Sequence, residues 1–534
     1  MRFGRFFLVL GMAILLFSCD LFMDEEQNIV YGGPGGGREN GKFYAQNMTN
    51  NKFYSLNADL LYEDANCKVW VEKNLGLTSV QALKAAEEAG KAYSKTGGIY
   101  EKMMAAFGSN DCMTDEGDPC DTMELADYYG DGDGKLCILL MKIKDSYHET
   151  KNPSYVAGYF TAYNYIEYES GYRDTWYSNE NDMIYLDIRF YNQIKPEYLG
   201  DYMNSVYNTL AHEMQHLMNF ITSVDKRSRA NDLDQMDLWI NEGLSSAAEF
   251  VWNGVHNKDR IDWFNGYYDE DEKMWYPNGW IAYGNNFYVW GNYTDQEPML
   301  ILDDYATVYL FFQWLRLQSN NDIGIYKEII NSKNADYRAV TAAAAKNIST
   351  DYNSNNWSLL LRDWLAANST NATTGRYGYK NDSHLSLVDV WCLSDEAGNT
   401  YPLAPGEGIY TKKMSKPATN GNINYSMLPK KLSPDNPDAS SEYRYLLSYN
   451  INTNMEDGFE YCDPFIGSYI SQSPELRSYN TAAGSASRSL ARFNPVMQKP
   501  YAISAGEMLR QNGYRDSSQY VDLTKFRAGV RIEK

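Results

Sequence analysis

The stretch Ala211-His212-Glu213-Met214-Gln215-His216 carries the most information in this sequence. It lies within 202–221, where apolar residues recur at spacings of four and seven, and this period predicts an amphipathic helix. Residues four positions apart share one face of a helix, so His212 and His216 can direct both imidazoles at one metal ion. Glu213 lies beside that face, where its carboxylate can act as a general base toward a water molecule.

The motif is specific because histidine is rare in this chain. Only 5 of the 534 residues are histidine, so a chance match is expected less than about once in a hundred such sequences. The alternative interpretation is a surface helix whose histidines have no role. The helical period around the motif favours the metal site.

A catalytic zinc site needs a third protein ligand and an open position for water. The metzincin pattern would require Gly at position 219 and His at position 222, but the sequence has Asn219 and Thr222. That class is therefore excluded. The other common arrangement takes a glutamate from a second helix.

Two glutamates of the helix predicted over 242–252 are candidates for the third ligand. Glu242 lies 26 residues after His216, which is enough chain for a connection and a returning antiparallel helix. Glu249 follows two turns later on the same face. We favour Glu242 and interpret Glu249 as a solvated carboxylate or one that supports the ligands.

The helix with this motif, followed by Asn241-Glu242-Gly243-Leu244-Ser245, resembles the gluzincin clan of thermolysin-like metallopeptidases. Within that clan the chain looks like the hyicolysin family of bacterial extracellular neutral peptidases. The similarity covers roughly residues 55 to 330. Supporting segments are Asp131-Gly132-Asp133-Gly134-Lys135, Val156-Ala157-Gly158-Tyr159-Phe160, Ser178-Asn179 and Ile184-Tyr185-Leu186-Asp187.

The resemblance implies an α+β fold with a zincin-type catalytic unit, in which a mixed sheet adjoins a helical part that carries the zinc site. It implies one catalytic Zn²⁺ held by His212, His216 and Glu242, with Glu213 as the general base. Protein or peptide substrates would lie extended along the sheet edge. Tyr305, at the start of a predicted helix, is the preferred oxyanion donor, and His256 is its rival.

Composition and period divide the chain into a signal segment, a tether, a catalytic unit and a β-rich C-terminal domain. These are residues 1–19, 20–45, 46–372 and 373–534, with the sheet part of the catalytic unit ending near residue 200 and its helical part beginning near 201. We predict strands at 67–71, 136–141, 183–188 and 445–451, helices at 80–93, 202–221, 242–252 and 305–317, and a loop-rich insertion at 253–298.

The N-terminal segment has the features of an export signal. Arg2 and Arg5 precede an apolar run that ends at Ser18-Cys19. This ending resembles a bacterial lipoprotein cleavage box, which would place a lipid on Cys19 and anchor the protein to the membrane of the cell envelope. The alternative is an ordinary secretory signal. No later stretch is long and apolar enough to span a membrane.

Charge and cysteine content restrict the partners further. A net charge of −22 makes nucleic-acid binding improbable. Beyond Cys19, six cysteines permit up to three disulfides in an exported protein, namely among Cys67, Cys112, Cys120, Cys137, Cys392 and Cys462. The loop at Asp131 and Asp133 is a candidate for calcium, although Lys142 stands where an EF-hand requires a bidentate glutamate.

Two other functional classes compete with a peptidase. One is a surface binding protein or adhesin that keeps the peptidase fold with little or no turnover. The other is a carbohydrate-binding lipoprotein, for which only the C-terminal part could carry the binding. The intact Glu213 favours catalysis, because a site without turnover does not need a base at that position. The sequence does not indicate an oligomeric state.

Overall fold

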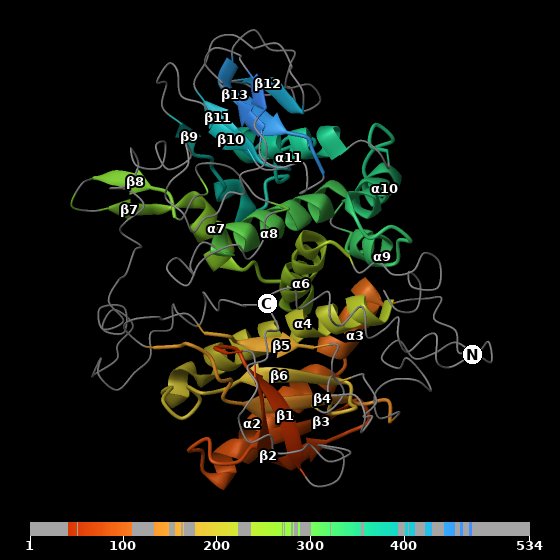
Figure 1. The fold of residues 1–534 in the computed structure, drawn as a ribbon, viewed down its shortest axis with the longest axis vertical. Coiled ribbons are helices and arrows are strands. Elements are labelled where there is room, and N and C mark those ends of the chain that lie inside the picture. Colours follow the sequence, from red (N-terminus) through yellow and green to blue (C-terminus); the bar gives the residue numbers. More distant parts are fainter. Residues whose placement is uncertain are drawn as a thin grey trace, which may run out of the picture. The chain divides into compact units, whose positions relative to one another are not determined.

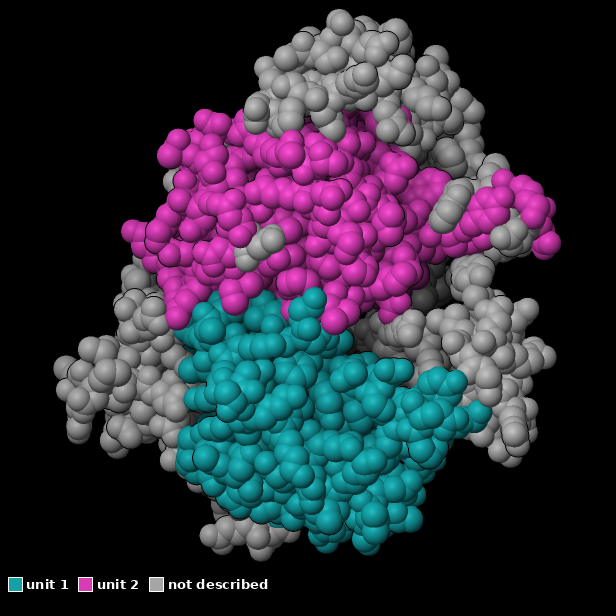
Figure 2. All heavy atoms as spheres, turned by 180° about the vertical axis from the view of Figure 1, so that it is seen from behind, with its two compact units in different colours: residues 1–235, 251–254, 503–534 teal, residues 236–250, 255–502 magenta. Residues whose placement is uncertain are grey.

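The computed structural model describes residues 41–50, 52–108, 133–148, 155–161, 164, 177–222, 236–269, 271, 273–278, 281, 287–288, 301–320, 322–353, 357–393, 401–403, 405–411, 422–429, 443–453, 460–462 and 469–471. The chain divides into two compact units, which have different colours in Figure 2. The described part of unit 1 lies within 41–222 and 251–254, and that of unit 2 within 236–250 and 255–471.

Unit 1 is built on a six-stranded mixed sheet, coloured red to yellow in Figure 1. Its strand order is β1-β2-β3-β4-β6-β5, with β1, β2, β3 antiparallel, β3, β4, β6 parallel and β5 antiparallel to β6. The strands are β1 Lys42–Asn47, β2 Lys52–Glu63, β3 Cys67–Glu72, β4 Leu136–Met141, β5 Gly158–Phe160 and β6 Met183–Asp187.

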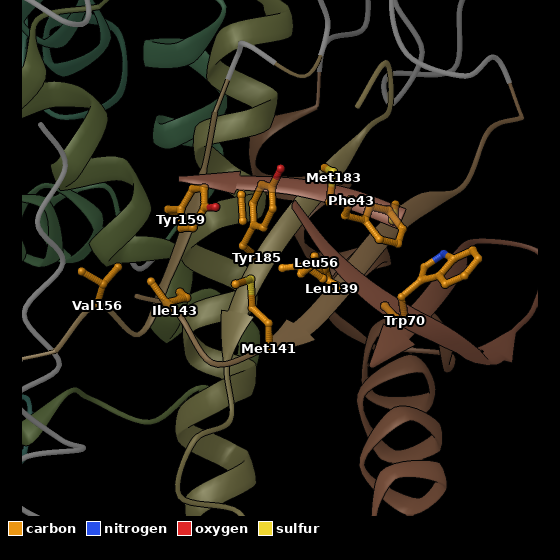
Figure 3. Close-up of a cluster of buried hydrophobic side chains, with 13 residues drawn as sticks. Phe43, Leu56, Trp70, Leu139, Met141, Ile143, Val156, Tyr159, Met183 and Tyr185 are labelled. Carbon is orange, nitrogen blue, oxygen red and sulfur yellow. The ribbon is translucent and has the colours of Figure 1, made fainter. Parts of the chain in front are cut away.

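The apolar sequence of the central strands explains their position. All six residues of β4 (Leu-Cys-Ile-Leu-Leu-Met) are buried, as expected for a parallel strand that is covered on both faces. One face of the sheet carries an aromatic-rich cluster, shown in Figure 3. In it the ring centroids of Tyr159 and Tyr185 lie 4.2 Å apart in a stack, and those of Phe43 and Trp70 lie 5.2 Å apart edge to face.

Helices cover the other face of the sheet. Helix α2 (Ser79–Ser94) packs on β2 and β3, and α4 (Leu199–Thr222) packs on β5 and β6. Helix α2 starts at a capping box formed by Thr78 and Gln81, which satisfies backbone donors of the first turn. The other helices of unit 1 are α3 Ile99–Phe107 and the 3-10 helix η3 Pro196–Tyr198.

The predicted strands at 67–71, 136–141 and 183–188 and the predicted helix at 80–93 are confirmed within one or two residues at each end. The prediction of up to three disulfides is wrong for two of its cysteines, because Cys67 and Cys137 are buried thiols. In the register of β3 and β4, Lys68 is the partner of Cys137. Cys67 therefore points to the opposite face of the sheet.

Burial raises the pKa of the Cys67 thiol to about 12. The remaining cysteines do not test the prediction of disulfides. Cys112 and Cys120 lie outside the described residues, and the side chains of Cys392 and Cys462 are not described.

Unit 2 contains most of the described helices. They are α6 Leu238–Asn253, whose last turn belongs to unit 1, α7 Lys258–Asn265, α8 Ile301–Gln318, α9 Gly324–Ile330, α10 Tyr337–Asn347, α11 Trp357–Thr370 and the 3-10 helix η7 Leu385–Leu387. Helix α8 is buried along its described length, and its apolar residues are accordingly not confined to one side. Trp239 lies in a buried aromatic cluster with Phe287, Phe311 and Trp357.

The predicted loop-rich insertion at 253–298 is wrong in part. Its described residues include α7 and a two-stranded sheet of β7 Tyr267–Asp269 and β8 Met274–Tyr276. Helix α7 forms because Ile261 and Phe264 are buried, while Lys258 and Asp262 form an ion pair four residues apart. Gly266, with φ +85°, ends the helix.

The C-terminal region is rich in strands, coloured blue in Figure 1. Strand β13 (Tyr443–Asn450) corresponds to the strand predicted at 445–451. Tyr410 of β11 (Gly408–Thr411) donates a hydrogen bond to the carbonyl of Leu365 in α11 (2.7 Å). A separate domain beginning at residue 373 stays a prediction. The strands are β9 Cys392–Leu393, β10 Tyr401–Leu403, β11 Gly408–Thr411, β12 Ile423–Pro429, β13, β14 Glu460–Cys462 and β15 Tyr469–Ser471, in sheets of order β12-β13-β11-β9 and β10-β14-β15.

The described chain is thus an α+β protein with a mixed sheet and helices. Within the described residues, none of the helices combines the length and the apolar character that crossing a membrane requires.

Candidate metal centre

Helix α4 carries both histidines of the motif. The helix predicted over 202–221 is confirmed, and every residue from Thr209 to Thr222 is buried. His212 is 0% exposed and His216 is 3% exposed, and their ring centroids lie 4.8 Å apart. The two imidazoles therefore share one face of the helix, as the spacing of four predicts.

The ligand atoms of His212, His216 and Glu242 all lie within 4.8 Å of one another, and all three residues are buried. No other group of three or more His, Cys, Asp or Glu residues that could hold a metal ion occurs among the described residues. Glu249, the rival candidate, is not a member of this group.

The end of α6 is fixed beside α4 by contacts inside unit 1. Asn253 donates a hydrogen bond to the side chain of Asn208 (2.8 Å), one turn before His212, and Lys102 donates to the carbonyl of Trp252 (2.7 Å). The same continuous helix carries Glu242 eleven residues before Asn253.

Unsatisfied buried atoms at the cluster fit a metal ion. The Nε2 atoms of His212 and His216 and the Oε2 atom of Glu242 are buried and make no hydrogen bond, while other atoms of these residues interact with their surroundings. A buried polar atom without a hydrogen bond is costly unless something else binds it. Two imidazole nitrogens and one carboxylate oxygen form a donor set that suits zinc.

Glu213 contacts the edge strand of the sheet. Its side chain is buried (1% exposed), and its Oε2 atom accepts a hydrogen bond from the backbone N–H of Phe160 in β5 (3.1 Å). The ring centroid of Phe160 lies 5.8 Å from that of Phe220, which is a later residue of α4. Strand β5 therefore positions a donor at the carboxylate predicted to be the base.

An ion network anchors the chain that leads into β5. The guanidinium of Arg189 binds Asp145 (2.8 Å) and Asp187 (2.7 Å), and all three side chains are almost fully buried. Asp145 also accepts a hydrogen bond from the backbone N–H of Val156 (2.8 Å). Burial raises the pKa of Asp187, and the charge of Arg189 opposes that shift. The network fixes the entry to β5 relative to the end of β6.

The two candidate oxyanion donors lie in different surroundings. Tyr305 on α8 is 1% exposed, and the guanidinium carbon of Arg260 lies 4.5 Å from the centre of its ring. His256 follows α6, where Nδ1 is 2.9 Å from the hydroxyl of Tyr309 and Nε2 is 3.1 Å from Asp382 Oδ2. Both ring nitrogens of His256 are thus engaged, and the role of Tyr305 as oxyanion donor stays a prediction.

Glu249 lies in a polar cluster that the sequence did not reveal. It is 4% exposed and accepts a hydrogen bond from Asn257 Nδ2 (2.8 Å). Burial raises the pKa of its carboxyl to about 7, against the opposing charge of Arg260. Asn257 also donates its backbone N–H to the hydroxyl of Tyr309 (2.9 Å), which links Glu249 to the His256 contacts.

Asp133, one of the two aspartates of the candidate calcium loop, already interacts with other residues of the protein. Asp133 forms an ion pair with Lys68 and accepts a hydrogen bond from the backbone N–H of Lys135 (2.9 Å). Asp131 lies outside the described residues. Calcium binding at this loop stays a prediction.

Comparison with known proteins supports a metallopeptidase. No protein-family model matches the chain. The neutral metalloprotease ShpI of Staphylococcus hyicus is 28% identical over 306 residues, which are 57% of this chain and 58% of that protein. The chain thus spans less than two thirds of the length of this relative. The similarity and the buried His-His-Glu cluster both fit a metallopeptidase.

Proposed function

We propose that this protein is a zinc metalloendopeptidase of the gluzincin type, similar to the hyicolysin family, in which His212, His216 and Glu242 bind the zinc ion. The observation that carries the proposal is the buried cluster of these three residues, whose ligand atoms lie within 4.8 Å of one another. The similarity to a neutral metalloprotease supports the same activity.

Each polar residue of the site has a chemical role in this proposal. Zinc bound by the three ligands would supply a Lewis acid that polarises the scissile carbonyl and makes water more acidic. Glu213 accepts the proton of the attacking water and delivers it to the leaving amine. The N–H of Phe160 holds the Glu213 carboxylate in place. Tyr305 donates a hydrogen bond to the developing oxyanion.

The open edge of β5 offers a binding surface for an extended peptide. Strand β5 is the last strand in the order of the described sheet. The N–H of Asp187 donates to the carbonyl of Ala157 (2.8 Å), so Ala157 faces β6. Because inward and outward backbone groups alternate in an antiparallel pair, those of Gly158 and Phe160 face outward. A substrate strand could pair with those of Gly158 by β-augmentation, whereas the N–H of Phe160 already donates to Glu213.

The test is zinc quantification on the purified protein together with casein hydrolysis in the presence and absence of a chelator. We expect one zinc ion per chain, hydrolysis that a chelator abolishes, and recovery on adding zinc. A protein that binds zinc or peptides without cleaving them would instead be a binding protein or adhesin on a peptidase fold. A protein without zinc and without hydrolysis would contradict the proposal.

We also propose that the protein is exported and anchored through a lipid on Cys19. The support is sequence alone, namely Arg2 and Arg5, the apolar run and Ser18-Cys19, since these residues lie outside the described part. We expect the wild-type protein to take up a lipid label and to partition into detergent, and the Cys19→Ser variant to lose the label. Wild-type protein released into the medium without lipid would contradict the anchor.

A further inference from the structure

We propose that Gly158 is a positioning residue for Glu213. The absence of a side chain at this position lets β5 lie close enough to α4 for the backbone N–H of Phe160 to reach the Glu213 carboxylate. This inference rests on the proposed function, because it assigns Glu213 the role of general base.

The space around Gly158 excludes even a methyl group. A Cβ atom added there would lie 2.6 Å from Thr209 Cγ2, 2.9 Å from the carbonyl oxygen of Tyr185 and 3.1 Å from Leu186 Cδ2. Tyr185 and Leu186 belong to the buried strand β6, and Thr209 is buried on α4. These neighbours cannot all move aside, so a side chain would displace β5 instead.

The contact at Gly158 and the contact at Glu213 are consecutive contacts of one strand with one helix. Gly158 and Phe160 are two residues apart in β5, about 6.6 Å along a strand. Thr209 and Glu213 are four residues apart in α4, about 6 Å along a helix. The two spacings match, so the contact between Gly158 and Thr209 and the contact between Phe160 and Glu213 follow one another along the same strand and the same helix. A displacement at the first contact is therefore transmitted to the second.

The hydrogen bond at the second contact tolerates little displacement. Its length of 3.1 Å is near the upper end of the usual range for N–H···O bonds, about 2.7–3.2 Å. A shift of β5 by a few tenths of an ångström would weaken it. A base that is misplaced by about 1 Å can lower turnover by about 10²-fold. Zinc binding should be unaffected, because the three atoms nearest to an added Cβ belong to Thr209, Tyr185 and Leu186 and to none of the ligands.

A double-mutant cycle tests the inference. Gly158→Ala should retain zinc but lower kcat by about 10- to 100-fold. Thr209→Ser deletes the methyl that would lie nearest to the new Cβ and keeps the hydroxyl bond to the carbonyl of Ser205 (3.1 Å). Alone it should leave kcat near the wild-type value, and combined with Gly158→Ala it should restore part of the loss. Gly200→Ala is the matched control on α4, since a Cβ there meets nothing within 4 Å.

Hydrogen exchange of the Phe160 amide provides a readout that does not depend on activity. We expect faster exchange in Gly158→Ala than in wild type, and slower exchange again in the double variant. If the wild-type protein has no zinc-dependent hydrolysis, the proposed function fails, while the exchange rates still test the contact between β5 and α4.

A backbone substitution covers the case in which Gly158→Ala does not fold. Replacing Phe160 by phenyllactate, which turns the amide into an ester, removes the N–H and keeps the side chain. We expect kcat to fall with zinc content unchanged. The inference would be overturned if this ester variant kept the wild-type kcat. It would also be overturned if a folded Gly158→Ala protein kept both the wild-type kcat and the wild-type exchange rate of the Phe160 amide.

Discussion

The carboxylate of Asp382 accepts a hydrogen bond from Nε2 of His256 at 3.1 Å, which joins residues 126 positions apart in the sequence. Because a carboxylate only accepts, Nε2 is the donor, and Nδ1 on the other side of the ring lies 2.9 Å from the hydroxyl of Tyr309. The hydroxyl oxygen in turn accepts from the N–H of Asn257. The imidazole thus ties α8 to the segment that follows α11.

Asp382→Asn should lower the stability of the protein at neutral pH. Burial acts to raise the pKa of Asp382, but hydrogen bonds from His256 and from the backbone of Leu385 and His384 outweigh it and hold the pKa below its usual value. The carboxylate therefore stabilises the fold above about pH 4, and this contribution is lost as the pH falls through the depressed pKa.

We expect Asp382→Asn to lose about 1.5–3 kcal/mol at pH 7, as for other hydrogen bonds to charged groups, and the difference from wild type to shrink in strong acid. Thermal unfolding over a pH series measures this. Asp351→Asn, which removes an exposed carboxylate paired with Arg376, is the control and should have little effect at any pH. A constant difference across the pH range would contradict the assignment.

Glu249→Gln should stabilise the protein at alkaline pH. The carboxyl has a pKa of about 7 in the folded protein against 4.5 for an ordinary glutamate. Its contribution to the free energy of unfolding is therefore fully present below pH 4.5 and is lost as the pH rises through 7. That loss is about 3 kcal/mol at most, at 1.36 kcal/mol per pKa unit. An amide can still accept from Asn257 but does not ionise.

Urea unfolding at pH 5 and pH 8 checks the Glu249→Gln prediction. The difference in the free energy of unfolding between the variant and wild type should favour the variant more at pH 8 than at pH 5. Glu87→Gln, at an exposed site on α2, should show no such dependence. Equal effects at both pH values would show that Glu249 does not ionise in this range.

Glu213→Gln should abolish peptide hydrolysis and leave zinc bound. Glutamine keeps the size and polarity of the side chain and can still accept from the N–H of Phe160, but it cannot take up the proton. General-base catalysis contributes about 10²–10⁴-fold, so turnover should fall by at least about 10²-fold. Zinc content and kcat are the measurements, and a variant that keeps more than about a tenth of wild-type turnover rules out Glu213 as the base.

Glu242→Ala should purify largely without zinc and be inactive, whereas Glu249→Ala should retain zinc. Only Glu242 belongs to the buried cluster with His212 and His216. The two glutamates are seven residues apart, about 10 Å along the helix, so they cannot both reach one ion. Metal analysis of both variants decides the question, and zinc lost only in the Glu249 variant would reverse the assignment.

The sequence predicted the parts of the site that depend on local spacing. His212 and His216 lie on one helical face because they are four residues apart, and the central strand β4 was evident from its continuous apolar run. Helix α7 was missed because it is short and its period is weak. The contact between His256 and Asp382 could not be predicted, since no local pattern links residues so far apart.

The reason for a glycine at position 158 is likewise invisible in the sequence. It depends on how closely β5 approaches Thr209 and the backbone of Tyr185. The failure to predict that Cys67 and Cys137 remain thiols has a similar cause, because only the register of β3 and β4 reveals that they point in opposite directions.

The opposite orientation of Cys67 and Cys137 bears on how the protein can be produced. A disulfide requires Cβ atoms that face each other at about 3.5–4.5 Å, so these two cysteines cannot cross-link within the native sheet. Oxidation of these two thiols is therefore not part of the pairing of β3 with β4. We accordingly expect β3 and β4 to pair equally well when the protein is produced in a reducing cytoplasm.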